Sequence, residues 1–141
     1  MTKAGPFVRL LHLSSERKRL LLRATGMLTF ASAAVAVLPF RYVIKLGSVP
    51  VGHRQSPTAA DIVWAVEAAS RRMLWRAVCI EKGLVAQRML RQAGVNAILH
   101  YGARHHPDTR TLEAHVWVTV EARALIGGEE AAAFVSVATY P

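Results

Sequence analysis

Cysteine is almost absent from this sequence, which has one, Cys79, among its 141 residues. A single cysteine excludes a disulfide within the chain, and paired spacings typical of structural zinc sites are also missing. A reducing, cytoplasmic setting follows, and we expect neither a metal nor another cofactor. His105 and His106 have no third ligand near them, so we interpret them as exposed loop residues.

Acidic residues are scarce in the first 50 residues, where Glu16 stands against eight Lys and Arg side chains, a net charge of +7. The rest of the chain has ten basic against eight acidic side chains, a net charge of +2. A basic segment can contact nucleic acid, anionic lipid or an acidic protein. The aromatic and basic residues are not interleaved as they are where bases stack, so we expect no nucleic-acid partner.

Charge is missing from Ala24 to Phe40, a stretch that Arg23 and Arg41 bracket. Its 17 residues are at the short limit for crossing a bilayer core of about 30 Å. Its distance from the N-terminus and the lack of a convincing cleavage site after it are unlike a secretory signal. We interpret it as a helix packed on the protein's own core or on a partner. The alternative is a helix at or in a membrane, which would make the protein membrane-associated.

Glycine and proline gather between residues 47 and 58, which indicates a linker. We therefore divide the chain into a basic, apolar helical arm over residues 1–50 and a single domain over residues 51–141. A chain of 141 residues with 52% apolar composition suits one buried core.

Two helices are predicted after the linker. Ser56 is followed by a proline and then by Asp61, a pattern that predicts Ser56 as the N-cap of the first helix. Apolar residues at helical spacing continue this helix to about Met73. The second helix is predicted from about Cys79 to Ala93, with Gly94 as its end.

The rest of the domain alternates with a period of two, which predicts strands. In the best-defined of them His115 and Trp117 lie on one face, and Val116 and Val118 lie on the other. A turn is predicted near Ala122 and an exposed loop over residues 103–111. Helices followed by an antiparallel meander indicate an α+β fold. The strands are predicted over residues 95–101, 114–121, 124–126 and 134–138.

Cys79 begins the second predicted helix, where unpaired backbone N–H groups and the helix dipole favour a thiolate. An imidazolium at His115 would add a full positive charge, and the same N–H groups could hold an oxyanion. The two residues could therefore act as nucleophile and base. The alternatives are a small buried cysteine and a histidine that is only a satisfied polar group on a half-buried strand.

The order of residues around this pair resembles a known family. Over about residues 56–141 the chain is similar to the transglutaminase-like leader peptidase of lasso-peptide biosynthesis. The similarity lies in the order of four features: the cysteine, its helix, the glycine after the helix and the strand with the histidine. The resemblance implies a papain-like α+β core with helices packed on a small antiparallel sheet. The segments that carry it are Trp75–Ile80, Leu84, Ala86–Arg88, Leu90, Gly94–Ala97, Leu112–Val118 and Leu125–Gly128, with a matching tail over Phe134–Pro141.

The resemblance implies a cysteine protease that cleaves the leader peptide from a ribosomally made precursor during its maturation. The chain resembles the protease half of a split system and has no room for a leader-binding domain. The expected partners are therefore the precursor leader peptide, a small leader-recognition protein and an asparagine-synthetase-like lasso cyclase. The basic arm could in addition contact a membrane surface.

Carried over residue by residue, the family's nucleophile, which forms the thioester, is Cys79, and its general base is His115. Family members commonly place an aspartate where this chain has Gly127. Glu129 is the predicted third catalytic residue. Glu130, a backbone carbonyl or a side-chain amide could orient His115 instead, in which case the two acids are ordinary solvated side chains.

Two tryptophans are candidates for binding the substrate. Trp117 would form a wall beside His115, and Trp75 would line the cleft or shape the oxyanion site. Packing in the core is the alternative for both. Two other functions remain open for the whole chain: a transglutaminase-like acyl transferase, or a non-catalytic assembly partner of a peptide-maturation complex.

Overall fold

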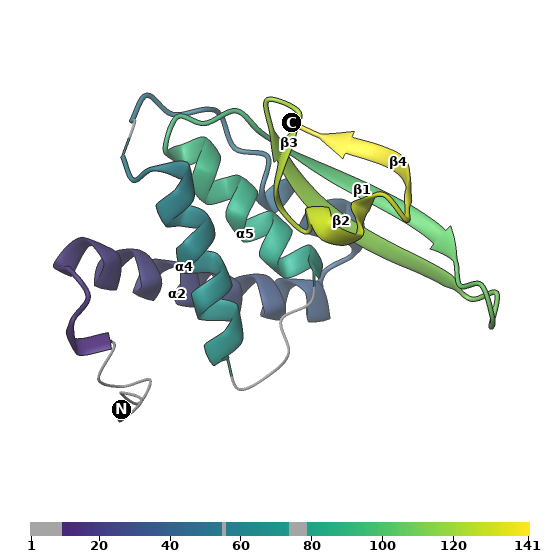
Figure 1. Ribbon diagram of the computed structural model, residues 1–141, viewed down its shortest axis with the longest axis horizontal. Helices are drawn as coiled ribbons and strands as arrows, with labels where there is room; N and C mark the ends of the chain where they lie inside the picture. The colour runs from purple at the N-terminus through teal and green to yellow at the C-terminus, as the bar shows by residue number, and fades with distance from the viewer. Residues whose placement is uncertain (1–9, 55, 74–78) are drawn as a thin grey trace.

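The computed structural model describes residues 10–54, 56–73 and 79–141 and has helices packed on a small antiparallel sheet (Figure 1). The predicted α+β class is therefore confirmed. The elements are α2 (Ser15–Val37), α3 (Phe40–Val43), the 3-10 helix η1 (Ile44–Leu46), α4 (Ala59–Arg72), α5 (Cys79–Gln92), β1 (Ala97–His105), β2 (Leu112–Val120), β3 (Arg123–Ile126), α6 (Gly128–Ala131) and β4 (Val135–Tyr140).

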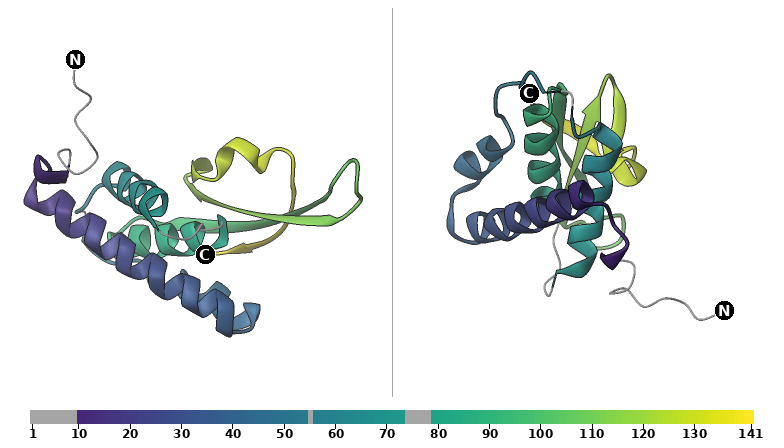
Figure 2. Two further views of the ribbon diagram at one scale, coloured as in Figure 1. Left: turned by 90° about the horizontal axis from the view of Figure 1, so that it is seen from below. Right: turned by 90° about the vertical axis from the view of Figure 1, so that its left-hand side faces the viewer.

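The apolar stretch predicted as an arm forms most of α2, which packs on α4 and α5 (Figure 2). Ala24 and Leu28 of α2 are fully buried and belong to one hydrophobic core together with Ile62 of α4 and Leu90 of α5. The interpretation of this stretch as a helix on the protein's own core is confirmed. The division of the chain at residue 50 stays a prediction, since the core is continuous across it.

Helix α5 begins and ends close to the predicted bounds, and Gly94 follows it with a φ of 86°. The start predicted for α4 is wrong by two residues, because Thr58 caps it and Ser56 does not. The side-chain oxygen of Thr58 accepts a hydrogen bond from the backbone N–H of Asp61 at 3.2 Å. Ser56 lies before the helix, outside its first turn.

Strand β1 is longer than its sequence pattern predicts, and it extends through His105 into the segment predicted as a loop. The reason is its partner, since β1 and β2 pair without a break from Ala97 opposite Val120 to His105 opposite Leu112. The exposed loop is therefore confined to residues 106–111. The turn predicted near Ala122 is confirmed, and both Glu121 and Ala122 have positive φ angles.

The strands form one sheet in the order β3-β2-β1-β4, so the predicted meander is wrong for the last strand. A meander would pair β4 with β3, but β4 pairs with β1 at the other side of the sheet. Helix α6 contacts β2 and carries the chain across it. Gly102 of β1 permits this crossing, since a Cβ atom there would lie 3.0 Å from Cβ of Phe134, just before β4.

Both faces of β2 are covered, and residues 115–118 are all buried. Val116 faces α5, because a Cβ atom on Gly83 of that helix would lie 2.6 Å from Cγ1 of Val116. Trp117 faces the other way, and its ring covers Gly102 of β1. The predicted alternation of this strand is therefore confirmed, with α5 on one side and the β3-α6-β4 segment on the other.

Candidate functional site

Cys79 and His115 line one hollow of the molecule, as the sequence predicts. Cys79 is the first residue of α5 and is half-buried, and His115 on β2 is buried with 8% of its surface exposed. The hollow also takes in the segment from Ala124 to Gly128 and the acids Glu129 and Glu130 of α6. The fold thus brings the predicted nucleophile, base and acids to one place.

The backbone of Gly127 holds the ring of His115. Nε2 of His115 lies 2.7 Å from the carbonyl oxygen of Gly127. Because a carbonyl oxygen can only accept a hydrogen bond, Nε2 carries the proton and Nδ1 is left as the basic nitrogen. A backbone carbonyl orients the imidazole here, which is one of the alternatives that the sequence leaves open.

Two aromatic rings pack near the His115 ring. The ring of Trp117 lies 6.0 Å from it at 21°, and that of Phe134 lies 5.1 Å from it at 31°, both measured between centroids. The guanidinium of Arg104 covers Phe134, and Trp117 stacks on His100, whose pKa is lowered by burial. Phe134 was not predicted, although an aromatic residue at the start of the last strand is a signal that could have indicated it.

The two predicted tryptophans have different outcomes. Trp117 lies beside His115 but is 9% exposed, and it supports the ring without being among the described residues that line the hollow. Trp75 lies outside the described residues, so its predicted role stays a prediction.

Cys79 and His115 are not hydrogen-bonded to each other in the described part of the chain. Val116 faces α5, so His115, its neighbour on β2, points to the opposite face of the sheet. Both residues nevertheless line the same hollow, at the part of β2 that lies before its pairing with β3 at Val118. Hydrogen bonds between catalytic residues are often long in the absence of substrate and shorten in the complex. For Cys79 and His115 to act together, their side chains must move closer when a substrate binds.

The structure gives a physical reason for the glycine at the position that the family commonly fills with aspartate. Gly127 has a φ of 71°, and a Cβ atom there would lie 2.6 Å from the carbonyl oxygen of Val116. Glu129 and Glu130 are exposed in α6, and within the described residues neither side chain bonds to His115. The choice of Glu129 as third catalytic residue stays a prediction.

Charged side chains of both signs surround the hollow. Lys82 of α5 pairs with Glu67 of α4 at 3.0 Å, and Arg104 of β1 pairs with Glu113 of β2 at 2.7 Å. Arg71 lines the same hollow. The hollow therefore has both donors and acceptors at its border.

A sequence model of the transglutaminase-like superfamily matches residues 24–139. The match runs from the middle of α2 to the end of β4 and therefore includes α5, β2 and both Cys79 and His115. Neither the curated proteins nor the solved structures contain a match. With more than half of its length in this match, the chain belongs to the transglutaminase-like superfamily.

Proposed function

We propose that this protein is a cysteine peptidase that removes the leader peptide from a lasso-peptide precursor. The superfamily includes cysteine proteases and acyl transferases, and the lasso-peptide substrate rests on the resemblance of residues 56–141 to the leader peptidases. The observation that carries the chemistry is Cys79 at the first residue of α5, in the same hollow as His115.

In the proposed reaction Cys79 loses its thiol proton to Nδ1 of His115, and the thiolate attacks the carbonyl carbon of the scissile peptide bond. Backbone N–H groups at the start of α5 stabilise the oxyanion that forms. The imidazolium then gives its proton to the leaving amine, and the leader stays on Cys79 as a thioester. Water, deprotonated by His115, hydrolyses the thioester and releases the leader acid and the thiol.

The remaining site residues act on His115 or on the peptide. The Gly127 carbonyl orients the ring, and Glu129 supplies the negative charge that stabilises the imidazolium. Because a carbonyl has no net charge, stabilising the positive charge of the imidazolium requires a carboxylate. Trp117 supports the ring of His115, and Trp75 lines the cleft.

The partners in this proposal follow from the substrate. A small leader-recognition protein presents the leader of the precursor, and an asparagine-synthetase-like cyclase closes the ring on the amine that cleavage frees. Their part in the reaction rests on the resemblance alone.

The direct test is cleavage of the precursor peptide by Cys79→Ala in the presence of the recognition protein. We expect the product to disappear, together with any thioester visible by intact mass spectrometry. His115→Ala should lose at least about a hundredfold in rate, because general base catalysis contributes about 10²–10⁴-fold. His105→Ala, on an exposed histidine at the end of β1, is the matched control. Full cleavage by Cys79→Ala would refute the proposal.

Mass spectrometry of the products also separates the peptidase from an acyl transferase of the same superfamily. Hydrolysis gives the leader as a free acid, while transfer gives the leader joined to an acceptor amine. A joined product as the main species would replace the peptidase with the transferase.

A non-catalytic assembly role is the second candidate, because Cys79 and His115 face different sides of β2 and Gly127 replaces the usual aspartate. Alkylation by iodoacetamide discriminates the two. If Cys79 is catalytic, its rate of alkylation should stay high at low pH because the thiolate is present there. His115→Ala should abolish this reactivity at low pH. Slow alkylation that is the same in both proteins would favour the non-catalytic role.

A further inference from the structure

One face of α2 is apolar and faces away from the protein. The buried face of the helix contains the core residues Ala24 and Leu28, whereas the opposite face has large apolar side chains in solvent. Leu22, Phe30 and Val37 are 73%, 64% and 79% exposed. We call the exposed residues of this face the outer face of α2: Arg19, Leu22, Arg23, Gly26, Thr29, Phe30, Ala33 and Val37. The hydroxyl of Thr29 bonds to the backbone carbonyl of Thr25, so it adds little polarity to the apolar centre.

The charge around the outer face is mostly positive, although the exposed Glu16 lies in the first turn of α2. Residues 17–60 contain seven Lys and Arg side chains and no Asp or Glu. Arg19 and Arg23 lie at one end of the apolar part, and Arg41 and Lys45 follow its other end, where Arg41 covers the ring of the half-exposed Tyr42. Basic and aromatic residues at the ends of an apolar helix face are typical of helices at a membrane interface.

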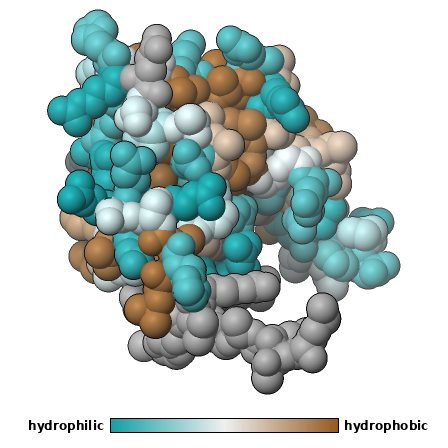
Figure 3. Space-filling view, turned by 60° about the vertical axis from the view of Figure 1, so that its left-hand side comes forward, coloured by the Kyte–Doolittle hydropathy of each residue, from teal (hydrophilic) through white to brown (hydrophobic). Residues whose placement is uncertain are grey.

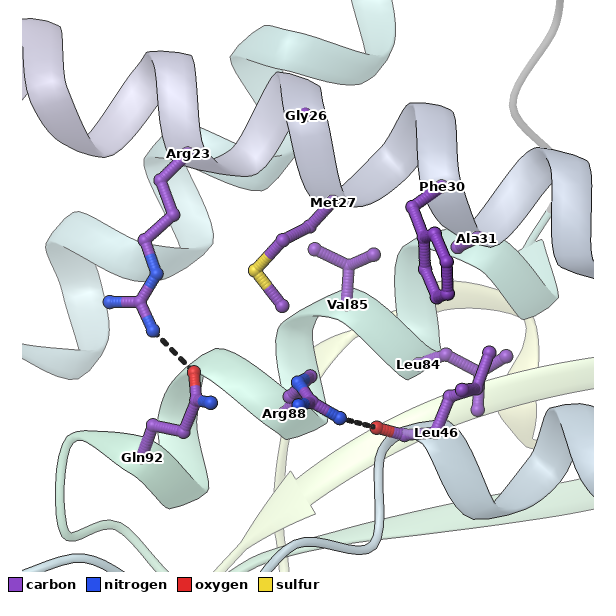
Figure 4. A pocket seen from close by; sticks show the side chains of 10 residues that line it. All are labelled: Arg23, Gly26, Met27, Phe30, Ala31, Leu46, Leu84, Val85, Arg88 and Gln92. Carbon is purple, nitrogen blue, oxygen red and sulfur yellow. Dashed lines mark hydrogen bonds between the residues drawn. The ribbon is translucent and has the colours of Figure 1, made fainter.

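A groove beside the outer face adds a place for an anionic head group. Figure 4 shows Arg23, Met27 and Phe30 of α2 on one side of it, with Val85 and Arg88 of α5 on the other. Arg23 bonds to the amide oxygen of Gln92, and Arg88 bonds to the carbonyl of Leu46 at 2.9 Å. Both partners are neutral, so within the described residues neither guanidinium is neutralised by a carboxylate, and each has further N–H groups for a phosphate.

We propose that the outer face of α2 docks this protein on the surface of an anionic lipid bilayer, with the helix axis along the surface. Apolar side chains are exposed among hydrophilic ones on the molecular surface (Figure 3). A lipid surface matches the outer face better than a protein partner does, because it satisfies an apolar centre and a mostly basic border together. The proposal does not depend on the proposed peptidase reaction.

Docking along the surface fits the dimensions of α2 better than spanning does. By length and apolar composition alone α2 could cross a membrane, although 33% of its most apolar window is buried inside the protein. Its uncharged part, residues 24–37, is about 21 Å long, short of the about 30 Å of a bilayer core. Insertion would also expose the core that Ala24 and Leu28 share with α4 and α5.

The test is flotation of the full chain with vesicles of phosphatidylcholine alone or mixed equally with phosphatidylglycerol. We expect binding to the mixed vesicles that weakens as salt rises, and little binding to phosphatidylcholine alone. Arg19→Glu with Arg41→Glu should weaken binding by about five-fold for each unit of charge changed. Arg110→Glu with Arg123→Glu changes the net charge equally at exposed positions away from α2, in the β1-β2 loop and on β3, and should retain binding much better.

The apolar contribution has its own pair of variants. Phe30→Ser with Val37→Ser should weaken binding to the mixed vesicles, whereas Leu112→Ser with Val135→Ser removes equally exposed side chains from the sheet and should not. Thermal unfolding by circular dichroism verifies that each variant is folded.

Three results would overturn the proposal. Equal binding to both vesicles, or no binding to either, removes the lipid surface as the occupant. Binding that withstands a high-salt wash indicates insertion. A dimer in solution that Phe30→Ser with Val37→Ser dissociates would assign the outer face to a second copy of the chain.

Discussion

Gly127 shows how one residue can decide which group orients a histidine ring. Its carbonyl bonds to Nε2 of His115 because the residue adopts a φ of 71° at the end of β3. A side chain there would meet the carbonyl of Val116. The same backbone shape that places the carbonyl therefore leaves no room for the aspartate that the resemblance to the leader peptidases leads one to expect at this position.

We expect Gly127→Asp to destabilise the protein without improving catalysis. The left-handed backbone costs a non-glycine residue about 1–2 kcal/mol, and the contact with Val116 adds to that. Urea unfolding of Gly127→Asp and of its matched control Gly127→Ala measures the effect, and both should lose a similar free energy of unfolding. A Gly127→Asp variant that is as stable as the wild type and cleaves the precursor faster would contradict this prediction. It would show that the backbone at Gly127 accepts a carboxylate and that the wild type lacks one there.

The elements that carry Cys79 and His115 were predictable from the sequence, but the surroundings of the two side chains were not. Local periodicity predicts Cys79 on a helix and His115 on a strand, and both are found there, with α5 described from Cys79 onward. The contacts of His115 with Gly127 and Phe134 depend on how the chain returns after β3. Local patterns contain no information on that return, so the ring's neighbours could not be assigned from them.

Helix α4 illustrates the same limit within one element. Its apolar period predicts the helix, but two candidate caps lie close together, Ser56 and Thr58, and only the second bonds to the first turn. Asp61 decides between them, since Thr58 Oγ1 also donates to its carboxylate at 2.8 Å. This reciprocal contact resembles a capping box, with the acid three residues after the cap.

Thr58→Ala should therefore lower the free energy of unfolding by about 1 kcal/mol, since it leaves the Asp61 N–H and carboxylate without this partner. Ser56→Ala is the matched control and should stay within about 0.5 kcal/mol of the wild type, as exposed substitutions usually do. Urea unfolding of the two variants side by side measures the difference. Equal losses would mean that Ser56 contributes to the cap as the sequence pattern predicts.

At the scale of the whole molecule, the order of the strands was the feature least predictable from the sequence. A period of two identifies a strand but names no neighbour, and β4 could pair with β3 or with β1. The pairing with β1 places Phe134 over Gly102 and against His115, and Nε2 of the Gln87 amide on α5 donates to the backbone carbonyl of Tyr140 at 2.6 Å. The last strand thus links the helical layer, the sheet and the candidate site.

The contact between α5 and the sheet sets where Cys79 lies relative to β2, and Gly83 controls that contact. A methyl group on Gly83 would lie 2.6 Å from Cγ1 of Val116 and 3.4 Å from Leu99, both buried and closely packed. Gly83→Ala should push α5 away from β2, destabilise the protein by about 1–3 kcal/mol and slow precursor cleavage, since Cys79 moves with the helix.

Gly26 of α2 is the matched control for this prediction, because a methyl group there meets nothing within 4 Å. Gly26→Ala should stabilise the protein by up to about 1 kcal/mol through helix propensity, with cleavage unchanged. Urea unfolding and a cleavage assay on both variants make the comparison. If Gly83→Ala were as stable and active as Gly26→Ala, the close approach of α5 to β2 would not be what positions Cys79. The position of Cys79 would then depend on the edge of β2 near His115.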